Sequence, residues 1–339
     1  MPVTRHTVAE TDADQRLDRW FRQKFPELGH GRLEKLLRTG QVRVDGKRVK
    51  AGHRLSPGQV IRIPPLELGL QDAVPARRQT ERPAGSTRED RKFLESIALY
   101  RDDAILVLNK PAGLPVQGGS GQIRHLDGML QSLRRSGEPP RLVHRLDKDT
   151  SGVIAVGLTR RATLALAAAF RGREVRKLYW AVVVGTPERR RGFIDLALAK
   201  RAGPAGERTV VGEDTGTGRK ADDTRSARTR YAVIDHAANQ LTWLALMPLT
   251  GRTHQLRAHC SAIGTPILGD GKYGGSAAFV AGLSRQVHLH AHRLVAPHPA
   301  GGWIDVEAAL PPHMSETFDM MGFDARADTD PFGLGAVGE

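Results

Sequence analysis

The sequence predicts an α+β protein of two domains, and three observations support this. The chain has 339 residues, more than twice the roughly 150 expected of one domain. Hydrophobic residues make up 40% and charged residues 26%, as in ordinary globular proteins, which excludes a disordered or fibrous chain. In the second half, candidate strands outnumber candidate helices without alternating one for one, which favours a mixed, mainly antiparallel sheet with packed helices over a doubly wound fold.

Composition also favours one cellular compartment. The longest mostly apolar run, residues 162–170, is far shorter than the roughly 20 residues of a membrane span. The N-terminus has no apolar core with a small-residue cleavage site, so no secretory signal is expected. The single cysteine, Cys260, excludes an internal disulfide and a cysteine-rich zinc site. We therefore expect a cytoplasmic enzyme or binding protein.

Positive charge is concentrated near the N-terminus. The chain has 51 Lys and Arg against 37 Asp and Glu, a net charge of +14. Residues 16–64 alone hold 13 basic and 4 acidic residues, a difference of +9. Such a segment repels itself unless it meets an anion, and phosphates attract Lys and Arg without regard to sequence. A solvated surface is the plainer interpretation, but the concentration of charge in one segment favours a nucleic-acid partner.

Residues 12–64 have the pattern of a small compact domain. Apolar residues recur at helical spacing in two stretches, and Gly40 ends the second predicted helix. Asp45-Gly46 is a strong signal for a two-residue hairpin turn. Residues 60–63 close the domain as a strand, so the predicted order is helix, helix, hairpin and strand, with the basic side chains outside.

The remaining residues divide into a linker, a larger domain and a tail. Residues 65–92 have scattered prolines and no sustained period, which is typical of a linker or an extended arm. Residues 93–318 form the larger domain, with an exposed insertion expected at residues 199–226, and residues 319–339 are expected to fray. The predicted strands are residues 104–108, 152–157, 178–184, 228–234 and 241–246, and the predicted helices are residues 126–133, 160–170 and 254–263.

The densest polar cluster is HRLDKDTSG, residues 144–152, directly before a predicted strand. A loop in that place presents its side chains from a rigid base. Asp147 and Asp149 stand two apart, with Arg145 and Lys148 beside them. By residue type alone, this pattern is more typical of a turn with surface ion pairs than of a catalytic site.

A second cluster, LTGRTHQLRAHC at residues 249–260, offers Arg252, His254 and Arg257 at the start of a predicted helix. Residues five apart do not share one helical face, but Arg252 and Arg257 both reach one cleft if Arg252 lies in the preceding turn. The alternative is that one arginine pairs with a surface carboxylate and the other is solvated.

Two further segments leave alternatives open. HLHAH places His288, His290 and His292 on one face if it is a strand, but acidic or cysteine ligands are missing nearby in the sequence, so we predict no metal. In KLYWAVV, Tyr179 and Trp180 point to opposite faces of a strand. One is expected in the core and the other is available to stack on a planar ligand, and their spacing does not say which.

Together these segments resemble the RluA family of pseudouridine synthases, which act on large-subunit ribosomal RNA. The resemblance covers residues 93–311 and includes HLHAHRLVAPHP near the end. The N-terminal segments RLDRWFRQKF and GRLEKLLRTGQVRVDGKRV resemble the S4 RNA-binding domain. GGSG, residues 118–121, resembles the C-type subgroup, which modifies several uridines near the peptidyl-transferase region. The motifs that carry the resemblance follow the family order: NKPAG at residues 109–113, HRLDKDTSG, RKLYWAVV from residue 176, TGRTHQLRAH and GDGKYGG.

The resemblance implies roles for four residues of the larger domain. Asp147, the carboxylate of HRLD, matches the essential aspartate, and Tyr179 matches the tyrosine that lies against the target base. Arg257 matches the basic residue that pairs with that aspartate. Arg145 matches the arginine that helps hold or replace the flipped nucleotide, and Asp149 is then a turn former.

The S4-like segment is expected to supply phosphate contacts. Basic side chains lie near one face of its second predicted helix and lead into its hairpin, where they face outward. Contacts of this kind give affinity for RNA without sequence specificity. The residues expected to bind RNA are Arg32, Lys35, Arg38 and Arg43.

The implied reaction breaks the C–N glycosidic bond of uridine, turns the uracil and rejoins it through carbon. It involves no redox step and no external group, so no cofactor is expected. Asp147 would attack the sugar carbon or remove a sugar proton to start a glycal route, and the sequence leaves both open. Burial would raise the pKa of this carboxyl and a nearby Arg257 would lower it. The target base must be flipped out or presented in a loop.

Two other classes of protein share part of this pattern. An S4-containing RNA-binding or ribosome-assembly factor without catalysis has no need of Asp147, Tyr179 and Arg257 together. A glycoside hydrolase holds two carboxyls about 5 Å or more apart across a sugar, but a basic N-terminal domain suits a polyanion better. We therefore expect an RNA-isomerising enzyme whose partner is RNA, with no obligate protein partner and no membrane.

Overall fold

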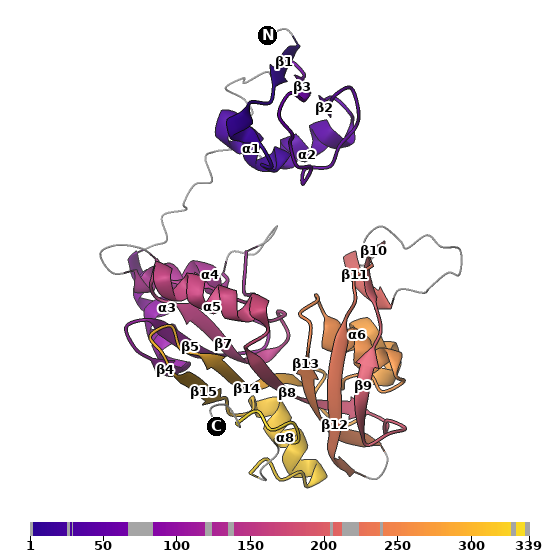
Figure 1. Ribbon diagram of the computed structural model, residues 1–339. Helices are drawn as coiled ribbons and strands as arrows, with labels where there is room; N and C mark the ends of the chain where they lie inside the picture. Colours follow the sequence, from indigo (N-terminus) through magenta and orange to yellow (C-terminus); the bar gives the residue numbers. More distant parts are fainter. Residues whose placement is uncertain are drawn as a thin grey trace. The chain divides into compact units, whose positions relative to one another are not determined.

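The computed structural model describes residues 3–25, 28, 30–66, 84–118, 124–134, 139–203, 206–211, 224–237, 240–326 and 330–335. The chain divides into two compact units, Met1–Arg82 and Pro83–Glu339, both drawn in Figure 1. Each unit has its own buried apolar core. Within the described ranges, no helix is both long enough and apolar enough to cross a membrane.

The smaller unit combines two helices with a three-stranded antiparallel sheet in the order β1-β3-β2. Trp20 and Phe21 are almost fully buried in its core, and the Trp20 indole donates a hydrogen bond of 3.0 Å to Asp12. Its first strand precedes residue 12, so the unit begins earlier than the predicted boundary. The elements are β1 (Thr4–Thr7), η1 (Glu10–Asp12), α1 (Leu17–Lys24), α2 (His30–Arg38), β2 (Arg43–Val44) and β3 (Val60–Ile63).

The predicted turns of this unit are present. Gly40 follows α2 with φ +72°, a conformation that glycine adopts at little cost. Asp45 and Gly46 both have positive φ, 49° and 74°, as a type I′ hairpin turn requires. Val44 and Lys47 close the turn by exchanging backbone hydrogen bonds of 3.1 and 2.9 Å. The hairpin prediction is therefore confirmed.

The larger unit is built on a sheet of ten described strands, in the order β4-β5-β7-β14-β8-β13-β12-β9, with β15 beside β14 and β6 beside β7. Among these described pairs, β7 and β14 are parallel and the others are antiparallel, which confirms the mixed, mainly antiparallel prediction. The strands are β4 (Ala98–Arg101), β5 (Ile105–Lys110), β6 (Arg141–Leu142), β7 (Ser151–Gly157), β8 (Arg176–Val184), β9 (Arg191–Asp195), β12 (Arg228–Ala237), β13 (Leu241–Pro248), β14 (Leu289–Pro297) and β15 (Trp303–Glu307).

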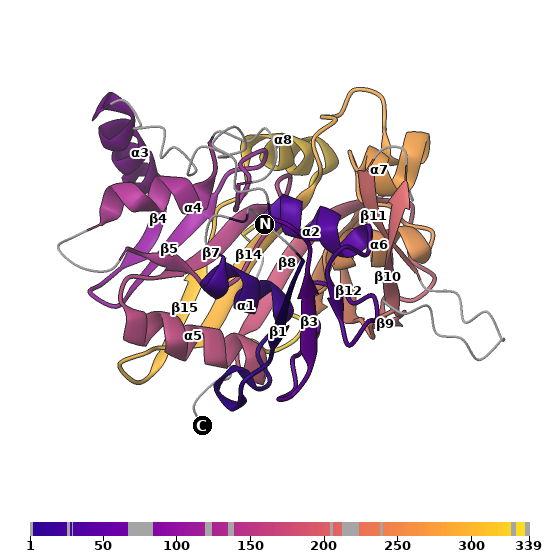
Figure 2. The same cartoon turned by 90° about the horizontal axis from the view of Figure 1, so that it is seen from above.

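Helices cover both faces of this sheet. On β5, Leu106 and Leu108 pack with Met129 of the short helices, whereas Ile105 and Val107 belong to the cluster that contains α5. Figure 2 shows α5 on the opposite side of β5 and β7 from α3 and α4. The described helices are α3 (Ala84–Ser96), α4 (Leu126–Met129), η2 (Leu130–Leu133), α5 (Arg160–Gly172), α6 (Gln255–Ala262), α7 (Gly271–Gly274), η3 (Gly275–Ala278) and α8 (Pro312–Met321).

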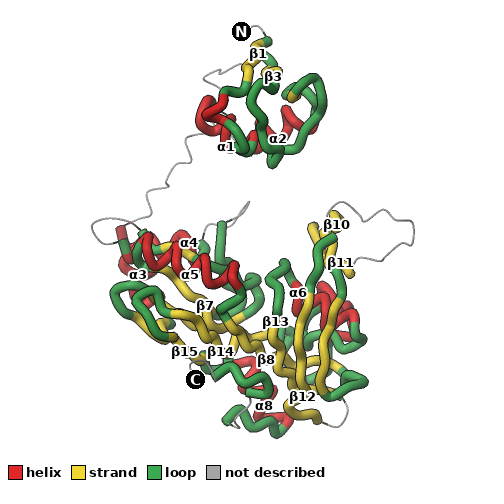
Figure 3. The backbone as a smooth tube through the Cα atoms, viewed as in Figure 1, coloured by secondary structure: helices red, strands yellow, loops and turns green. Residues whose placement is uncertain are grey.

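The predicted linker is helical where the structure describes its end. Residues 67–83 lie outside the described residues, but α3 occupies residues 84–96, drawn as helix in Figure 3. Asp90 and Leu94 of this helix are 4% and 1% exposed, and Leu94 joins the main core of the larger unit. Burial against that core, which local pattern does not reveal, accounts for the difference.

The predicted insertion at residues 199–226 also contains ordered structure. Strands β10 (Leu198–Gly203) and β11 (Gly206–Val211) form an antiparallel hairpin, and residues 204–205 and 212–223 lie outside the described residues. Thr209 is 5% exposed, and its backbone N–H donates to the Tyr273 hydroxyl at 3.2 Å. The described part of the insertion is therefore packed against the unit rather than wholly exposed.

The expected frayed tail is likewise packed over its described residues. Residues 319–321 complete α8, and residues 327–329 and 336–339 lie outside the described residues. Phe323 and Leu334 are 6% and 1% exposed, in the cluster that contains Trp180 and Trp243. Long-range apolar burial, which acidic and glycine-rich composition does not predict, holds this segment.

Candidate active site

A cleft of about 1080 Å³ opens in the larger unit between the HRLD loop, β8, the end of β13 and the start of α6. Among its described lining residues, seven are Lys or Arg and one, Asp147, carries a carboxylate. Such an excess of basic side chains suits a polyanionic substrate. The basic residues are Arg145, Arg171, Arg173, Arg176, Lys177, Arg252 and Arg257, and burial lowers the pKa of Lys177.

A buried lysine holds the loop that carries Asp147. The Lys110 ammonium donates to the carbonyl oxygens of Pro111, Leu114 and Lys148 at 2.8, 3.0 and 3.0 Å. Burial lowers the pKa of Lys110 to about 8, and the nearby Asp149 and Asp147 carboxylates oppose that shift. The lysine of NKPAG therefore ties this loop to the loop after β5. The sequence did not indicate a role for Lys110, because only the fold brings these two loops together.

Gly152, at the end of the HRLDKDTSG motif, lies where β7 packs closely against β14. Its φ is +108°, and a Cβ atom there would lie 2.2 Å from the Ala291 carbonyl oxygen. No side chain fits where β7 and β14 approach this closely. Beside it, the Ser151 hydroxyl lies 2.8 Å from His290 Nδ1. The second half of the motif thus fixes the base from which Asp147 projects.

The structure resolves the ambiguity between Tyr179 and Trp180. Tyr179 is 7% exposed and lines the cleft, whereas Trp180 is 2% exposed and packs with Trp243 and Phe318 on the other face of β8. Burial, with a further contribution from Asp147, raises the pKa of Tyr179, so its phenol stays protonated. Of the two aromatic rings, Tyr179 is the one available to a ligand in the cleft.

Arg257 lines the cleft but pairs with a different carboxylate from the one expected. Its Nε and Nη2 atoms donate to Asp270 at 2.7 Å each, and the two side chains are 5% and 0% exposed. The expected ion pair with Asp147 is therefore wrong as a direct contact. Asp147 still lies near enough to help stabilise the arginine charge. The sequence did not single out Asp270, which belongs to the GDGKYGG motif.

His254 is the basic group that lies nearest to Asp147 among the described ion-pair contacts. Its Nε2 atom is 3.8 Å from Asp147 Oδ1, and the side chains are 19% and 23% exposed. His254 directly precedes α6 with φ 52° and ψ 24°, a left-handed conformation. Holding a residue other than glycine there costs about 1 kcal/mol or more. His254 belongs to the second polar cluster of the sequence, but no role was predicted for it.

The remaining predicted residues of the cleft differ in their surroundings. Arg145 is exposed at the cleft, where a ligand can reach it. Arg252 donates from Nε to the Ser226 carbonyl at 3.1 Å. Arg252 and Arg257 both line the cleft, as expected if Arg252 lies in the turn before the helix. Lys177 also lines the cleft but was not predicted as a site residue. It lies two residues from Tyr179 on β8 and therefore shares its face.

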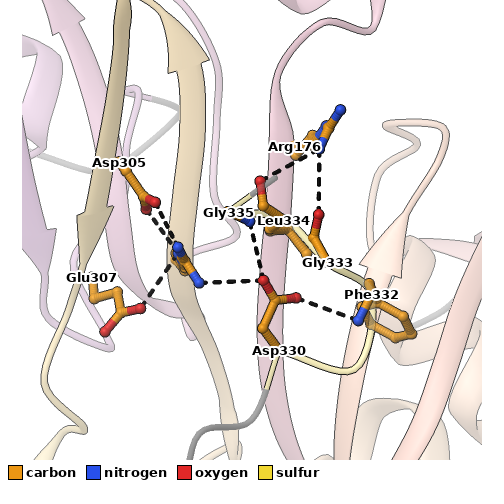
Figure 4. A network of polar contacts seen from close by, with 9 residues as sticks. Arg176, Asp305, Glu307, Asp330, Phe332, Gly333, Leu334 and Gly335 are labelled. Carbon is orange, nitrogen blue, oxygen red and sulfur yellow. Dashed lines mark hydrogen bonds and ion pairs between the residues drawn. The ribbon is translucent and has the colours of Figure 1, made fainter. Parts of the chain in front are cut away.

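The C-terminal segment forms one end of the cleft wall, and Figure 4 shows how it is held. Arg293 binds Asp305 and Glu307 of β15 and also reaches Asp330 at 3.4 Å. Arg176 donates to the carbonyl oxygens of residues 333 and 334 at 3.4 Å each. Phe332 and Leu334 line the cleft. A segment expected to fray thus contributes to the surface that a ligand meets.

The three histidines of HLHAH each interact with protein groups. His288 lies 2.9 Å from the Thr317 hydroxyl, His290 contacts Ser151, and His292 stacks on Trp180 with ring centroids 3.5 Å apart. Burial lowers the pKa of all three, to about 4, 3 and 4 respectively. The described part of the chain contains no group of three side chains placed to hold a metal ion. These histidines serve packing and hydrogen bonding around β14.

The four basic residues singled out in the smaller unit are not equivalent. Lys35 and Arg38 are exposed on α2, and Arg32 is half-buried. Arg43 donates to the Gly40 and Gly46 carbonyl oxygens at 3.0 and 3.1 Å. Lys35 and Arg38 are therefore the more accessible to a phosphate, while Arg43 also braces the hairpin.

Comparisons with known proteins agree with this cleft and fold. The sequence pattern of the RNA pseudouridylate synthase family matches residues 104–262, which include the HRLD loop, β8 and α6. The chain belongs to this family, and within it to the RluA type that the motifs predicted. It is accordingly an enzyme that isomerises uridine to pseudouridine in RNA.

Several relatives cover much of the chain. Ribosomal large subunit pseudouridine synthase C of Vibrio cholerae is 33% identical over 319 residues, which span 93% of this chain and 95% of that protein. RNA pseudouridine synthase 4, mitochondrial, of Arabidopsis thaliana is 39% identical over 290 residues, 76% of this chain but 59% of that protein. The solved structure of human RNA Pseudouridylate Synthase Domain Containing 4 has a TM-score of 0.57 and 27% identity, and covers 70% of this chain and 97% of that one.

Proposed function

We propose that this enzyme modifies uridines of large-subunit ribosomal RNA and that Asp147 starts the reaction. The observation that carries the catalytic part is a single carboxylate among seven Lys and Arg side chains in the described lining of the cleft. The RNA class is supported by relatives named for the large ribosomal subunit, which align over most of this chain. Because ribosomal RNA is the proposed substrate and the chain has a single cysteine, a reducing, cytoplasmic location fits best.

The proposed roles follow from where each group lies. Asp147 attacks the sugar carbon or removes a sugar proton, either of which an ionised carboxylate in a cleft can do. Tyr179 lies against the uracil while the glycosidic bond is broken. Arg145, exposed at the cleft, holds the flipped nucleotide or takes its place in the RNA. These groups need no external reactant, because every atom of the uridine is retained in the product.

The smaller unit is proposed to be an S4-type RNA-binding domain, with residues 12–64 as its core. It holds much of the positive charge of the chain, and Lys35 and Arg38 of α2 are open to solvent. Phosphate contacts from such side chains give affinity without reading sequence. The proposed division of labour is therefore binding by the smaller unit and chemistry in the cleft of the larger one.

Asp147→Asn tests the catalytic proposal. The variant is expected to form no pseudouridine in unmodified large-subunit RNA, with RNA affinity and unfolding close to those of the parent protein, because the amide is nearly isosteric. Asp149→Asn is the matched control and is expected to keep most of the activity. Product formation by Asp147→Asn, after mass analysis has excluded deamidation back to aspartate, would disprove the role of Asp147.

The substrate class is tested separately. Chemical mapping of pseudouridine in RNA from cells lacking this protein is expected to show losses in large-subunit ribosomal RNA. Losses in another RNA, with large-subunit RNA unchanged, would contradict the proposed substrate while leaving the enzyme class intact.

A further inference from the structure

His254 has an unusual backbone conformation at the edge of the proposed catalytic group. Its φ of 52° and ψ of 24° place it in the left-handed region, directly before the first turn of α6. Side chains other than glycine and asparagine seldom adopt that conformation, and when they do they gather at functional sites, where surrounding contacts hold them. The conformation directs the imidazole between two polar groups.

Those two groups lie on opposite sides of the ring. Nδ1 is 2.8 Å from the Tyr273 hydroxyl, and Nε2 is 3.8 Å from Asp147 Oδ1. The Tyr273 oxygen also accepts the backbone N–H of Thr209 at 3.2 Å. A line of polar contacts therefore runs from β11 through Tyr273 and His254 to Asp147. At 3.8 Å the contact with Asp147 is longer than a hydrogen bond, and catalytic contacts often shorten when substrate binds.

The position of the ring proton follows from this line. An oxygen that accepts an N–H keeps its own proton to donate, and burial raises the pKa of Tyr273, so the phenol is protonated. When the phenol donates to Nδ1, the single proton of the neutral imidazole is on Nε2. Nε2–H then faces the Asp147 carboxylate, whose oxygens can accept from it.

We propose that His254 is a positioning residue for Asp147, with Tyr273 fixing its tautomer. This proposal rests on the proposed role of Asp147. Nε2–H orients the carboxylate toward the sugar, while the ring itself exchanges no proton with the substrate. His259, one turn further along α6, serves as a contrast: it is fully buried and contacts Thr229 and the Leu196 carbonyl, away from the carboxylate.

The charged groups around His254 come from three segments. Burial is the largest influence and lowers the pKa of His254. The Asp147 carboxylate of the HRLD loop and Asp270, before α7, oppose that shift, whereas Arg257 of α6 and Lys272 of α7 add to it. The imidazole is therefore neutral at neutral pH, which is the state in which it can accept from Tyr273 and donate toward Asp147.

Single-turnover rates at saturating RNA test the proposal. His254→Asn tolerates the left-handed backbone but lacks a group at the Nε2 position. Its rate is expected to fall roughly three- to tenfold, as for the loss of one hydrogen bond that forms when this contact shortens around substrate, with RNA affinity unchanged. His254→Gln, which returns an N–H near that position, should recover part of the lost rate.

Two further variants sharpen the comparison. Tyr273→Phe removes the hydroxyl that fixes the ring and should lower the rate by less. His298→Asn alters a different histidine–aspartate pair, in which His298 Nε2 lies 2.7 Å from Asp102, and should leave the rate unchanged. A parental rate in His254→Asn, or a lower rate that His254→Gln does not restore in part, would overturn the proposal, because the second result describes a structural role alone.

Histidine-selective ¹⁵N NMR provides a readout that needs no catalysis. His254 is expected to carry its proton on Nε2, and its pKa should fall in Asp147→Asn, since the carboxylate that raises it is removed. A proton on Nδ1, or an unchanged His254 pKa in that variant, overturns the positioning role. If the parent protein forms no pseudouridine while these NMR results hold, the failure lies in the proposed function and not in the His254–Asp147 contact.

Discussion

Arg257 donates two hydrogen bonds of 2.7 Å to the Asp270 carboxylate, and both side chains are almost completely buried. Asp270 also accepts the Tyr273 backbone N–H at 3.3 Å at the start of α7. The pair therefore joins α6 to the GDGKYGG segment beneath the cleft. Its charge is compensated within the protein, which leaves the Asp147 carboxylate to face the cleft and His254.

This geometry predicts different consequences for the two arginines of the GRTHQLR segment. Arg257→Ala should lower the free energy of unfolding by about 3 to 5 kcal/mol, because it leaves Asp270 charged and buried. Arg252→Ala removes an exposed side chain and should cost about 0.5 kcal/mol or less. Urea unfolding of both variants checks the difference, and the activity loss should be greater in Arg257→Ala. Equal destabilisation of the two would contradict the assignment.

The lowered pKa of Lys110 predicts how the free energy of unfolding depends on pH. Its pKa is lowered from 10.5 to about 8 in the folded protein, mainly by burial. Below pH 8 the amine is charged in both folded and unfolded states, and between about 8 and 10.5 the unfolded chain retains a proton that the folded protein has released. Linkage then requires that this group's contribution to stability rises with pH across that window, by at most about 3 kcal/mol.

Lys110→Met removes that contribution. The free energy of unfolding of the parent protein minus that of the variant should therefore increase between pH 8 and 10.5. Lys148→Met, at an exposed lysine of the same loop, is the control and should follow the parent protein. A constant difference between parent and Lys110→Met would mean that Lys110 keeps an ordinary pKa in the folded protein.

The packed C-terminal segment predicts that Leu334 contributes to stability. Leu334→Ala should lower the free energy of unfolding by about 2 to 4 kcal/mol, because the side chain is 1% exposed within an apolar cluster. Leu164→Ala, at a leucine of α5 that is 61% exposed, should change it by about 0.5 kcal/mol or less. Tryptophan fluorescence during urea unfolding follows the cluster directly. A neutral Leu334→Ala would indicate a frayed tail.

The smaller unit predicts a separation of binding from chemistry. Deleting residues 1–70 should weaken binding to ribosomal RNA and flatten its salt dependence, because much of the positive charge is removed. The single-turnover rate at saturating RNA should remain, since every proposed catalytic residue lies in the larger unit. Affinity across a salt series and the saturated rate check both parts. Unchanged affinity and slope would exclude an RNA-binding role for this unit.

Point variants locate the contacts within that unit. Lys35→Gln combined with Arg38→Gln should reduce the salt slope by about 1.4 to 1.8, if each side chain binds one phosphate. Arg43→Gln should reduce it by less, because the Arg43 guanidinium already donates to two backbone carbonyl oxygens. A larger effect from Arg43→Gln would reverse this order.

The local sequence was sufficient to predict those features that depend only on neighbouring residues. The helices of the smaller unit follow from apolar spacing, and the turn at Asp45-Gly46 follows from the positive φ that its residues accept. The motifs and their order predicted the family through resemblance, whereas the residue types of HRLDKDTSG alone favoured an ordinary turn. The mixed sheet followed from strands that outnumber helices.

Tertiary structure decided what depends on distant neighbours. A strand pattern places Tyr179 and Trp180 on opposite faces, but only the fold shows that Tyr179 lines the cleft while Trp180 packs on Trp243. The resemblance paired Arg257 with Asp147, but the fold buries Arg257 against Asp270 instead. Residues 84–92 and 330–335 have the composition of a linker and a tail. They are nevertheless ordered, because apolar side chains in or next to these segments pack against residues distant in the sequence. Burial energy depends on the whole fold, so no local pattern contains it.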